Sequence, residues 1–212
     1  RVCPYGFDHA QQSVRTVDLL EKDGQGLNLT FEVRDGIWNH QTKGHPMTLE
    51  GCVVRYSDKI AYIHHDMDDA IRAGILKETD VPKGIQEAIG ATTGERLDCF
   101  IHDIVSNSYG KSEIAMSPPV EEAMRDLRKF MFDRVYLNPE AKGEEGKAEI
   151  LMETLYDYYL HHLELLPPEY QMLVERKGEP GERVVCDYVG AMTDRFAIAK
   201  YEEIYIPRSW RY

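Results

Sequence analysis

One long two-faced segment, residues 48–73, constrains the fold of this chain most. If each residue advances by about 100° around a helix, the apolar side chains gather within roughly 100° on one side. The other side presents acids, an imidazole and a phenol. The segment therefore predicts a long helix that packs on one side only. The apolar side holds Val53, Tyr56, Ile60, Ile63, Met67, Ala70 and Ile71, and the polar side holds Arg55, Asp58, Tyr62, His65, Asp66 and Asp69.

Helical patterns also fill most of the remaining chain, with glycine and proline between them. No alternation of apolar and polar residues persists long enough to build a sheet. The pattern therefore predicts a mainly α fold. The other expected helices cover residues 11–21, 30–38, 82–89, 93–108, 117–137, 147–165, a short stretch after 167–168, and 182–204.

The charge balance restricts the class of partner. The chain carries a net charge of −12. A protein that binds nucleic acid usually needs a basic surface to neutralise phosphates, so this chain is a poor candidate for general DNA binding. A small phosphorylated ligand stays compatible with the charge, because a few local cations or a metal can override the global sign.

The apolar runs and the cysteines bear on location. No apolar run approaches the ~20 residues needed to cross a bilayer, so we expect no membrane span. The cysteines at 3, 52, 99 and 186 are far apart and form no CxxC pair. This spacing is typical of neither a zinc ribbon nor a dense disulfide framework. We interpret them as reduced thiols of a cytoplasmic protein.

Four stretches resemble the dGTPase-like family of HD-type phosphohydrolases. The longest is LEGCVVRYSDKIAYIHHDMDDAI at residues 49–71, which looks like a diagnostic segment of that family. The stretch GFDHAQQSVR at residues 6–15 resembles the family's GF(D/E)HNxQSLR, with Ala10 in place of Asn. GLNLTFEVRDGI at 26–37 matches the next helix. DYVGAMTDRFA at 187–197 resembles DYIAGMTDRYA, with Gly and Ala exchanged.

The resemblance implies both a fold and an activity. The fold would be an HD-domain-like helical bundle, represented in part, with a C-terminal helical extension. Residues 1–110 would form the C-terminal part of the HD domain, and residues 111–212 a helical region that packs on it. The intact protein would hydrolyse a deoxynucleoside triphosphate (dNTP) to deoxynucleoside and inorganic triphosphate. Relatives are commonly oligomers, so a homo-oligomer is expected.

The same resemblance assigns candidate site residues one by one. Asp58 matches the distant Asp of the family's metal site. Lys59 would lie near the substrate phosphates, and Tyr62 and Asp66 would surround the deoxyribose. His9 matches a histidine near the phosphates in some relatives, where it could protonate a leaving oxygen at neutral pH.

An absence sets this chain apart from the family pattern. HD hydrolases hold a divalent metal with a His, an adjacent His-Asp pair and a distant Asp. The first three ligands precede the GFDH stretch in the family, and the eight residues before His9 do not match them. The metal could be Mn, Mg, Fe or Zn, which all accept carboxylate and imidazole ligands. We expect this chain alone to bind metal weakly and to be inactive.

Other interpretations of the sequence stay open. The chain could be a non-catalytic module for nucleotide sensing or oligomerisation, or a different HD phosphohydrolase that acts on monophosphates or cyclic dinucleotides. The run His64-His65-Asp66 could be mistaken for the His-Asp metal pair, but adjacent helix residues point about 100° apart. Arg15, Arg34 and Arg55 could reach phosphate, although surface ion pairing is the simpler interpretation.

Overall fold

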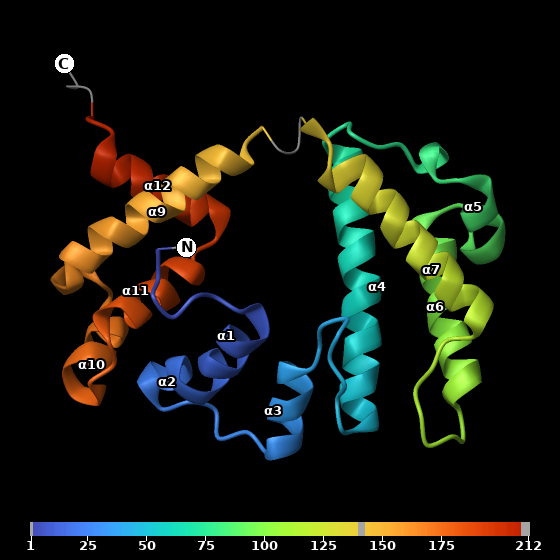
Figure 1. Cartoon of the computed structure of the whole chain (residues 1–212), viewed down its shortest axis with the longest axis horizontal. Helices are drawn as coiled ribbons and strands as arrows, with labels where there is room; N and C mark the ends of the chain where they lie inside the picture. The colour runs from blue at the N-terminus through green and yellow to red at the C-terminus, as the bar shows by residue number, and fades with distance from the viewer. Residues whose placement is uncertain (1, 140–142, 209–212) are drawn as a thin grey trace. The chain divides into compact units, whose positions relative to one another are not determined.

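The computed structural model describes residues 2–139 and 143–208, and within these ranges the chain forms helices and loops without a strand (Figure 1). The predicted mainly α class is thus confirmed. The α-helices are α1 (His9–Arg15), α2 (Glu21–Gly24), α3 (Phe31–Trp38), α4 (Leu49–Arg72), α5 (Lys83–Ile89), α6 (Thr93–Ser108), α7 (Pro118–Met131), α9 (Glu145–His161), α10 (Pro168–Lys177), α11 (Gly181–Gly190) and α12 (Asp194–Tyr205). Two π-helical segments, η1 (Thr16–Leu20) and η3 (Phe132–Tyr136), and two 3₁₀ turns, η2 (Glu78–Asp80) and η4 (Leu163–Leu165), complete the described elements.

The chain divides into two compact units, and each has its own hydrophobic core. The terminal unit consists of Arg1–Leu29 and Gly143–Tyr212, and the central unit of Thr30–Lys142. This division differs from the boundary expected between residues 110 and 111. The reason is that α6, before that boundary, and α7, after it, contribute side chains to the same core.

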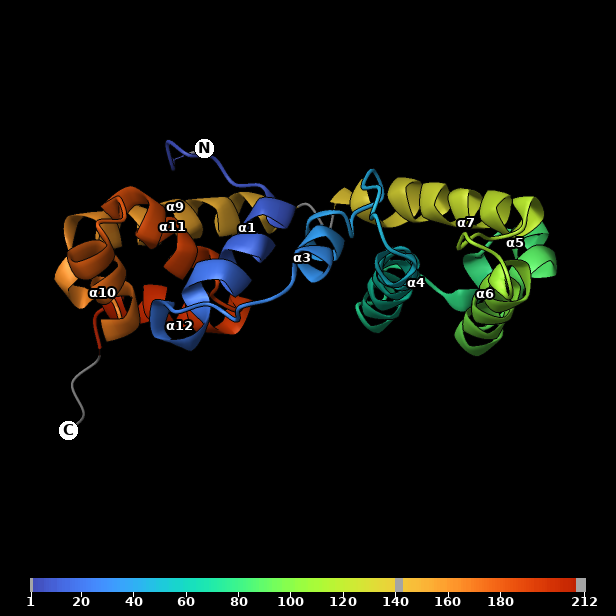
Figure 2. The ribbon, with the colours of Figure 1, turned by 90° about the horizontal axis from the view of Figure 1, so that it is seen from below.

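The central unit packs α4, α5, α6 and α7 around one apolar core. Figure 2 shows α4 and α6 nearly end-on, with α7 lying across them. Met67 of α4, Phe100 of α6 and Leu127 of α7 are fully buried at its centre. Burial of such side chains stabilises a fold by about 1.5–3 kcal/mol each relative to leaving them in water. The predicted apolar side of α4 is therefore its packing side from Ile60 onward.

The first turns of α4 depart from the expected pattern. Val53 was expected on the packing side but is 46% exposed. Here α4 instead packs on α3 through two glycines: a Cβ built on Gly51 would lie 3.5 Å from the Cα of Gly36 and 2.6 Å from the Cβ of Pro46. Contact through Gly51 turns Val53 outward, because the two residues lie on different sides of the helix.

Both ends of α4 follow ordinary capping chemistry. The hydroxyl of Thr48 accepts a hydrogen bond from the backbone N–H of Gly51 at 3.0 Å, which satisfies one of the free donors of the first turn. The helix ends before Gly74, whose φ of +74° lies in the left-handed region that glycine adopts without strain. The predicted segment 48–73 is thus confirmed as one helix with its caps.

The terminal unit joins elements from the two ends of the described chain. Helix α9 packs against α11 and α12, and α10 packs against α2 and α11. The rings of Tyr159 and Tyr188 meet edge to face with centroids 5.0 Å apart, a favourable arrangement for aromatic pairs. Leu155, Val184 and Val185 are fully buried beside them. The contact of α2 with α10 joins residues more than a hundred positions apart.

The single helix predicted over residues 182–204 was wrong, because the structure has two helices there. Helix α11 ends at Gly190 and α12 begins at Asp194. The Thr193 hydroxyl accepts a hydrogen bond from the backbone N–H of Phe196 at 3.3 Å and so begins a new helix. The apolar period continues across this break, which is why the pattern alone merged the two helices.

Two further expectations concern the cysteines and the membrane. The thiols of Cys3, Cys52, Cys99 and Cys186 are all free. Among the helices of residues 2–139 and 143–208, none combines the length and the apolar character that a bilayer crossing requires.

Truncation of a side chain at the centre of the central unit's core should show how much that core contributes to the free energy of unfolding. We expect Leu127→Ala to lower the free energy of unfolding by about 2–5 kcal/mol, since it removes buried methyl groups and leaves a cavity. Val54→Ala, at a side chain that is 52% exposed on α4, should change it by less than about 0.5 kcal/mol. Urea unfolding followed by helical circular dichroism measures both. Equal effects would contradict the assigned core.

Candidate functional site

Helix α4 positions four of the predicted site residues. Lys59, Tyr62 and Asp66 recur at intervals of three and four residues, so they lie along one side of the helix. Asp58 and Tyr62 are exposed, whereas Lys59 and Asp66 are half-buried. Tyr62 and Asp66 were expected on the polar side of this helix, and the structure adds Lys59 to that side. The chemical roles of these residues stay predictions.

A pair of tyrosines stands beside Asp66. Tyr136 of η3 donates its hydroxyl hydrogen to the Asp66 carboxylate. Its ring lies 6.4 Å from the ring of Tyr62, centroid to centroid. Burial, followed by the hydrogen bonds with Asp66 and Tyr62, raises the pKa of Tyr136 far above its usual value, so the hydroxyl stays protonated. Asp66 keeps free lone pairs, because a carboxylate can accept about four hydrogen bonds.

Three arginines lie close enough to Lys59 to lower its pKa, and together with Lys59 they are called the cation cluster. Burial lowers the pKa of Lys59, and the charges of Arg55, Arg128 and Arg125 lower it further, against one acid, Glu121. Arg55 belongs to α4, and Arg125 and Arg128 to α7. Both α7 arginines are exposed. On a chain with a net charge of −12, this local excess of positive charge marks a place where an anion would be stabilised.

The loop before α4 holds two of these arginines. An Nη of Arg55 donates to the carbonyl of Thr42 at 2.9 Å, and an Nη of Arg128 donates to the Thr42 hydroxyl at 3.5 Å. The Arg55 Nε–H is buried and has no hydrogen-bond acceptor among the described residues. A buried donor without an acceptor costs about 1–3 kcal/mol, so an acceptor supplied by a ligand would recover part of that energy.

Sequence reasoning missed the contribution of the segment 118–136. Arg125, Arg128 and Tyr136 lie where the resemblance to the dGTPase-like family is weak. The available signal was local: Arg125 and Arg128 are three residues apart in a predicted helix, and so lie on one side of it. Only the packing of α7 on α4 shows which side chains they meet.

The described residues do not by themselves fit a metal centre. Asp58 offers one exposed carboxylate. Within residues 2–139 and 143–208, no three His, Cys, Asp or Glu side chains converge where an ion could be held. A single carboxylate holds a divalent ion poorly, because such ions take four or more ligands.

The adjacent histidines of α4 face different environments. The ring of His64 is buried, makes a hydrogen bond with the carbonyl of Ile60 at 2.7 Å, and meets the ring of Phe100 edge-on with centroids 5.9 Å apart. His65 is exposed. Because the two rings leave the helix in such different directions, His64 and His65 do not face a common metal site with Asp66.

His9 belongs to the other unit. It is the first residue of α1 in the terminal unit, and its side chain is exposed. The Asp8 carboxylate caps this helix by accepting a hydrogen bond from the backbone N–H of Gln11 at 2.8 Å. The candidate site residues are thus divided between two compact units, with His9 in one and the α4 residues in the other.

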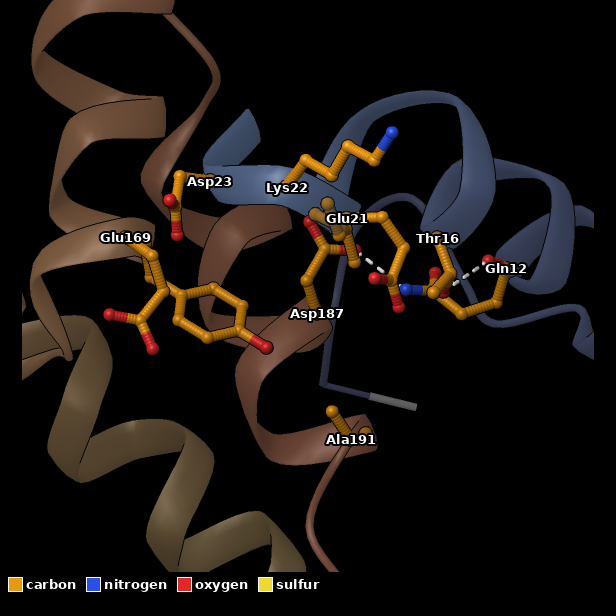
Figure 3. A pocket seen from close by; sticks show the side chains of 11 residues that line it. Gln12, Thr16, Glu21, Lys22, Asp23, Glu169, Asp187 and Ala191 are labelled. Carbon is orange, nitrogen blue, oxygen red and sulfur yellow. Dashed lines mark hydrogen bonds between the residues drawn. The ribbon is translucent and has the colours of Figure 1, made fainter. Parts of the chain in front are cut away.

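The terminal unit also contains a cavity of about 320 Å³. Its walls include Gln12, Tyr170 and the buried Asp187 (Figure 3). Lys22 and Asp23 at its edge both have positive φ values, +52° and +54°. None of the five predicted site residues lines this cavity.

Comparison with known proteins identifies the relatives of this chain. Residues 114–203 match the family described as phosphohydrolase-associated domain. A deoxyguanosinetriphosphate triphosphohydrolase-like protein of Caldanaerobacter subterraneus subsp. tengcongensis is 48% identical over 205 residues. By sequence, this chain is similar to dGTPase-like phosphohydrolases over most of its length. Proteins of the same name from Clostridium perfringens (strain 13) and Geobacter metallireducens are 44% and 32% identical.

The dGTPase-like relatives are longer than this chain. The alignments cover 97% of this chain but only 60% of the Caldanaerobacter protein and 62% of the Clostridium perfringens protein. The Geobacter alignment covers 95% of this chain and 65% of that protein. The chain thus spans about 60–65% of the length of these curated relatives.

Burial of His64 predicts a pH dependence of stability. Burial lowers the pKa of His64 and nearby Arg96 and His65 lower it further, against the hydrogen bond to Ile60 and the charge of Asp68. As the pH falls below about 6.5, the unfolded chain binds a proton that the folded chain does not. Stability should therefore decrease between about pH 6.5 and pH 5, where unfolding experiments can measure it.

Two variants test whether His64 causes this pH dependence of stability. His64→Leu should flatten the stability profile in that pH range, because the buried titrating group is gone. His65→Gln, which removes only the smallest of the named contributions to the pKa of His64, should change the profile little. A slope that survives in His64→Leu would show that another group causes it.

Proposed function

We propose that the protein that carries this chain hydrolyses a deoxynucleoside triphosphate and releases the deoxynucleoside and inorganic triphosphate. The observation that carries this proposal is the cation cluster around Lys59, set beside Tyr62, Tyr136 and Asp66 in the central unit. A polyphosphate needs several cations, and a sugar needs a flat apolar surface with a hydrogen-bond acceptor. The cations of α4 and α7 would meet the first requirement, and Tyr62 with Asp66 of α4 would meet the second.

The phosphate end would be held by Lys59, Arg55, Arg125 and Arg128. The lowered pKa of Lys59 reflects burial and the repulsion of its cationic neighbours. A bound triphosphate would relieve that repulsion and accept hydrogen bonds from the guanidinium groups, which suit phosphate geometry. This is a physical reason for an acidic protein to bind an anionic substrate at this place.

The sugar end would be held by Tyr62 and Asp66. A tyrosine ring packed under the sugar leaves little room for a 2′-hydroxyl, which favours a deoxynucleotide. Asp66 would accept a hydrogen bond from the 3′-hydroxyl while Tyr136 keeps the carboxylate oriented. This part of the proposal accounts for the choice of sugar and leaves the base unspecified.

The remaining assignments rest on the relatives, whose name refers to deoxyguanosine triphosphate. In the intact protein Asp58 would contribute one carboxylate to a divalent metal centre, which supplies Lewis-acid chemistry when bound. His9 would donate a proton to the leaving oxygen. The cytoplasmic location and the homo-oligomeric state stay predictions.

A second candidate function is supported by the lack of other metal-ligating side chains beside Asp58 among the described residues. Since no set of metal ligands gathers among the described residues, a non-catalytic nucleotide-binding module fits the same cations and tyrosines. Nucleotide binding without turnover would then be the protein's activity. Turnover of the intact protein distinguishes the two candidates.

Removal of Asp58 should abolish hydrolysis. The intact protein, supplied with dGTP or dATP and Mn²⁺, is expected to release inorganic triphosphate, measured by ion chromatography. Asp58→Ala should reduce this release to background. Asp69→Ala, which removes another exposed carboxylate of α4, should keep the rate of the unchanged protein.

Two other outcomes would contradict the triphosphohydrolase proposal, and a third would contradict the role of Asp58. Release of orthophosphate from a monophosphate, or cleavage of a cyclic dinucleotide, would indicate a different HD phosphohydrolase. Nucleotide binding without any turnover would favour the non-catalytic module. Full activity of Asp58→Ala would remove that residue from the site.

The cation cluster can be tested without turnover. The 212-residue chain should bind inorganic triphosphate in isothermal titration calorimetry, and Arg128→Gln should weaken binding about tenfold through loss of a charged hydrogen bond. The matched variant Lys83→Gln removes an exposed cation of α5 in the same unit and should have little effect. Equal weakening by both would mean that binding follows net charge alone.

A further inference from the structure

The carboxylate of Asp187 is fully buried and lies at the centre of a hydrogen-bond network in the terminal unit. Arg15 Nε donates to both of its oxygens at 2.9 Å, and Arg15 Nη2 donates to Oδ2 at 2.7 Å. Gln12 Nε2 donates to Oδ1 at 2.8 Å (Figure 3). Arg183 donates in turn to the Gln12 side-chain oxygen at 3.0 Å. Asp187 thus ties α1 to α11.

Helix α1 buries little of its own surface. It has seven residues, of which only Ala10 is buried, and it continues directly into η1, whose Leu19 and Leu20 pack against the core of the terminal unit. The Asp187 network adds directional contacts to that packing. A helix this short is unstable alone in water, because nucleation costs more than its few hydrogen bonds return. A buried carboxylate, for its part, must keep its partners or pay a large desolvation cost. Asp187 therefore enforces one docked arrangement of α1.

The contact with Gln12 sets how α1 is rotated about its axis. His9 and Gln12 are three residues apart and so lie on neighbouring parts of the same helix side. When Gln12 is held by Asp187 and Arg183, the direction of the His9 Cα–Cβ bond is fixed as well.

We propose that Asp187 is a positioning residue for His9, acting through Gln12 and Arg15 of α1. The inference rests on the catalytic role of His9 proposed above. It also gives a physical reason for the presence of two distant stretches, residues 6–15 and 187–197, in one chain: the acid of one binds the arginine and the amide of the other.

Hydrogen exchange of the 212-residue chain tests the anchoring of α1. In Asp187→Asn, amides of residues 11–15 should exchange about tenfold faster or more, because the helix opens locally. Amides of α9 and α12 should keep their protection. Gln12→Met is the second variant: it keeps the Arg15–Asp187 pair and should still accelerate exchange in α1. If Asp187→Asn unfolds the whole terminal unit, the exchange rates of Gln12→Met test the anchoring of α1 instead.

A matched control separates Asp187 from the second carboxylate that Arg15 binds. Glu179→Gln removes the partner of Arg15 Nη2 at 2.7 Å but leaves the Asp187 contacts in place. It should leave exchange in α1 unchanged. Unchanged exchange in Gln12→Met, or acceleration by Glu179→Gln equal to that of Asp187→Asn, would overturn the anchoring by Asp187.

A double-mutant cycle in the intact protein tests whether Asp187 acts through His9. Asp187→Asn should lower kcat for triphosphate release about tenfold or more with KM little changed. In a His9→Gln background the same substitution should lower kcat no further. A further loss there would indicate a general structural role and overturn the proposal. If His9→Gln keeps full activity, the catalytic role of His9 fails and the positioning role with it, whereas α1 anchoring is judged by exchange alone.

Discussion

Burial of one side of α4 is the constraint on which the candidate site depends. Because Ile63 and Met67 must stay in the core of the central unit, the helix cannot rotate, and the directions of Lys59, Tyr62 and Asp66 are set. The same packing brings α7 against α4. The apolar core and the cation cluster are therefore two consequences of one helix contact.

The side chains near Lys59 in the central unit are mostly cations, whereas the chain as a whole has a negative net charge. A net charge of −12 disfavours general polyanions, whereas the proposed phosphate site around Lys59 would attract one small anion. Arg55 and Arg128 both reach Thr42, so the loop before α4 limits where their guanidinium groups can go. Such preorganisation lowers the entropy lost when an anion binds.

The terminal unit solves a different problem, since it joins segments from both ends of the described chain. Apolar packing between α9, α11 and α12 supplies its core, but such packing is not directional. The Asp187 network adds direction, because hydrogen bonds to a buried carboxylate tolerate little displacement. Together these contacts place the short helix that bears His9.

Local sequence by itself determined the helical class, the extent of α4, and the shared side of Tyr62 and Asp66, since the helical period acts over a few residues. It did not determine the break at Thr193, the outward turn of Val53, or the division into units. The partners of the site residues were also beyond it: Tyr136 meets Asp66, and Asp187 meets Arg15, across 70 and 172 positions. Only the tertiary structure decides such contacts, because they depend on how whole helices pack and not on the pattern within any one of them.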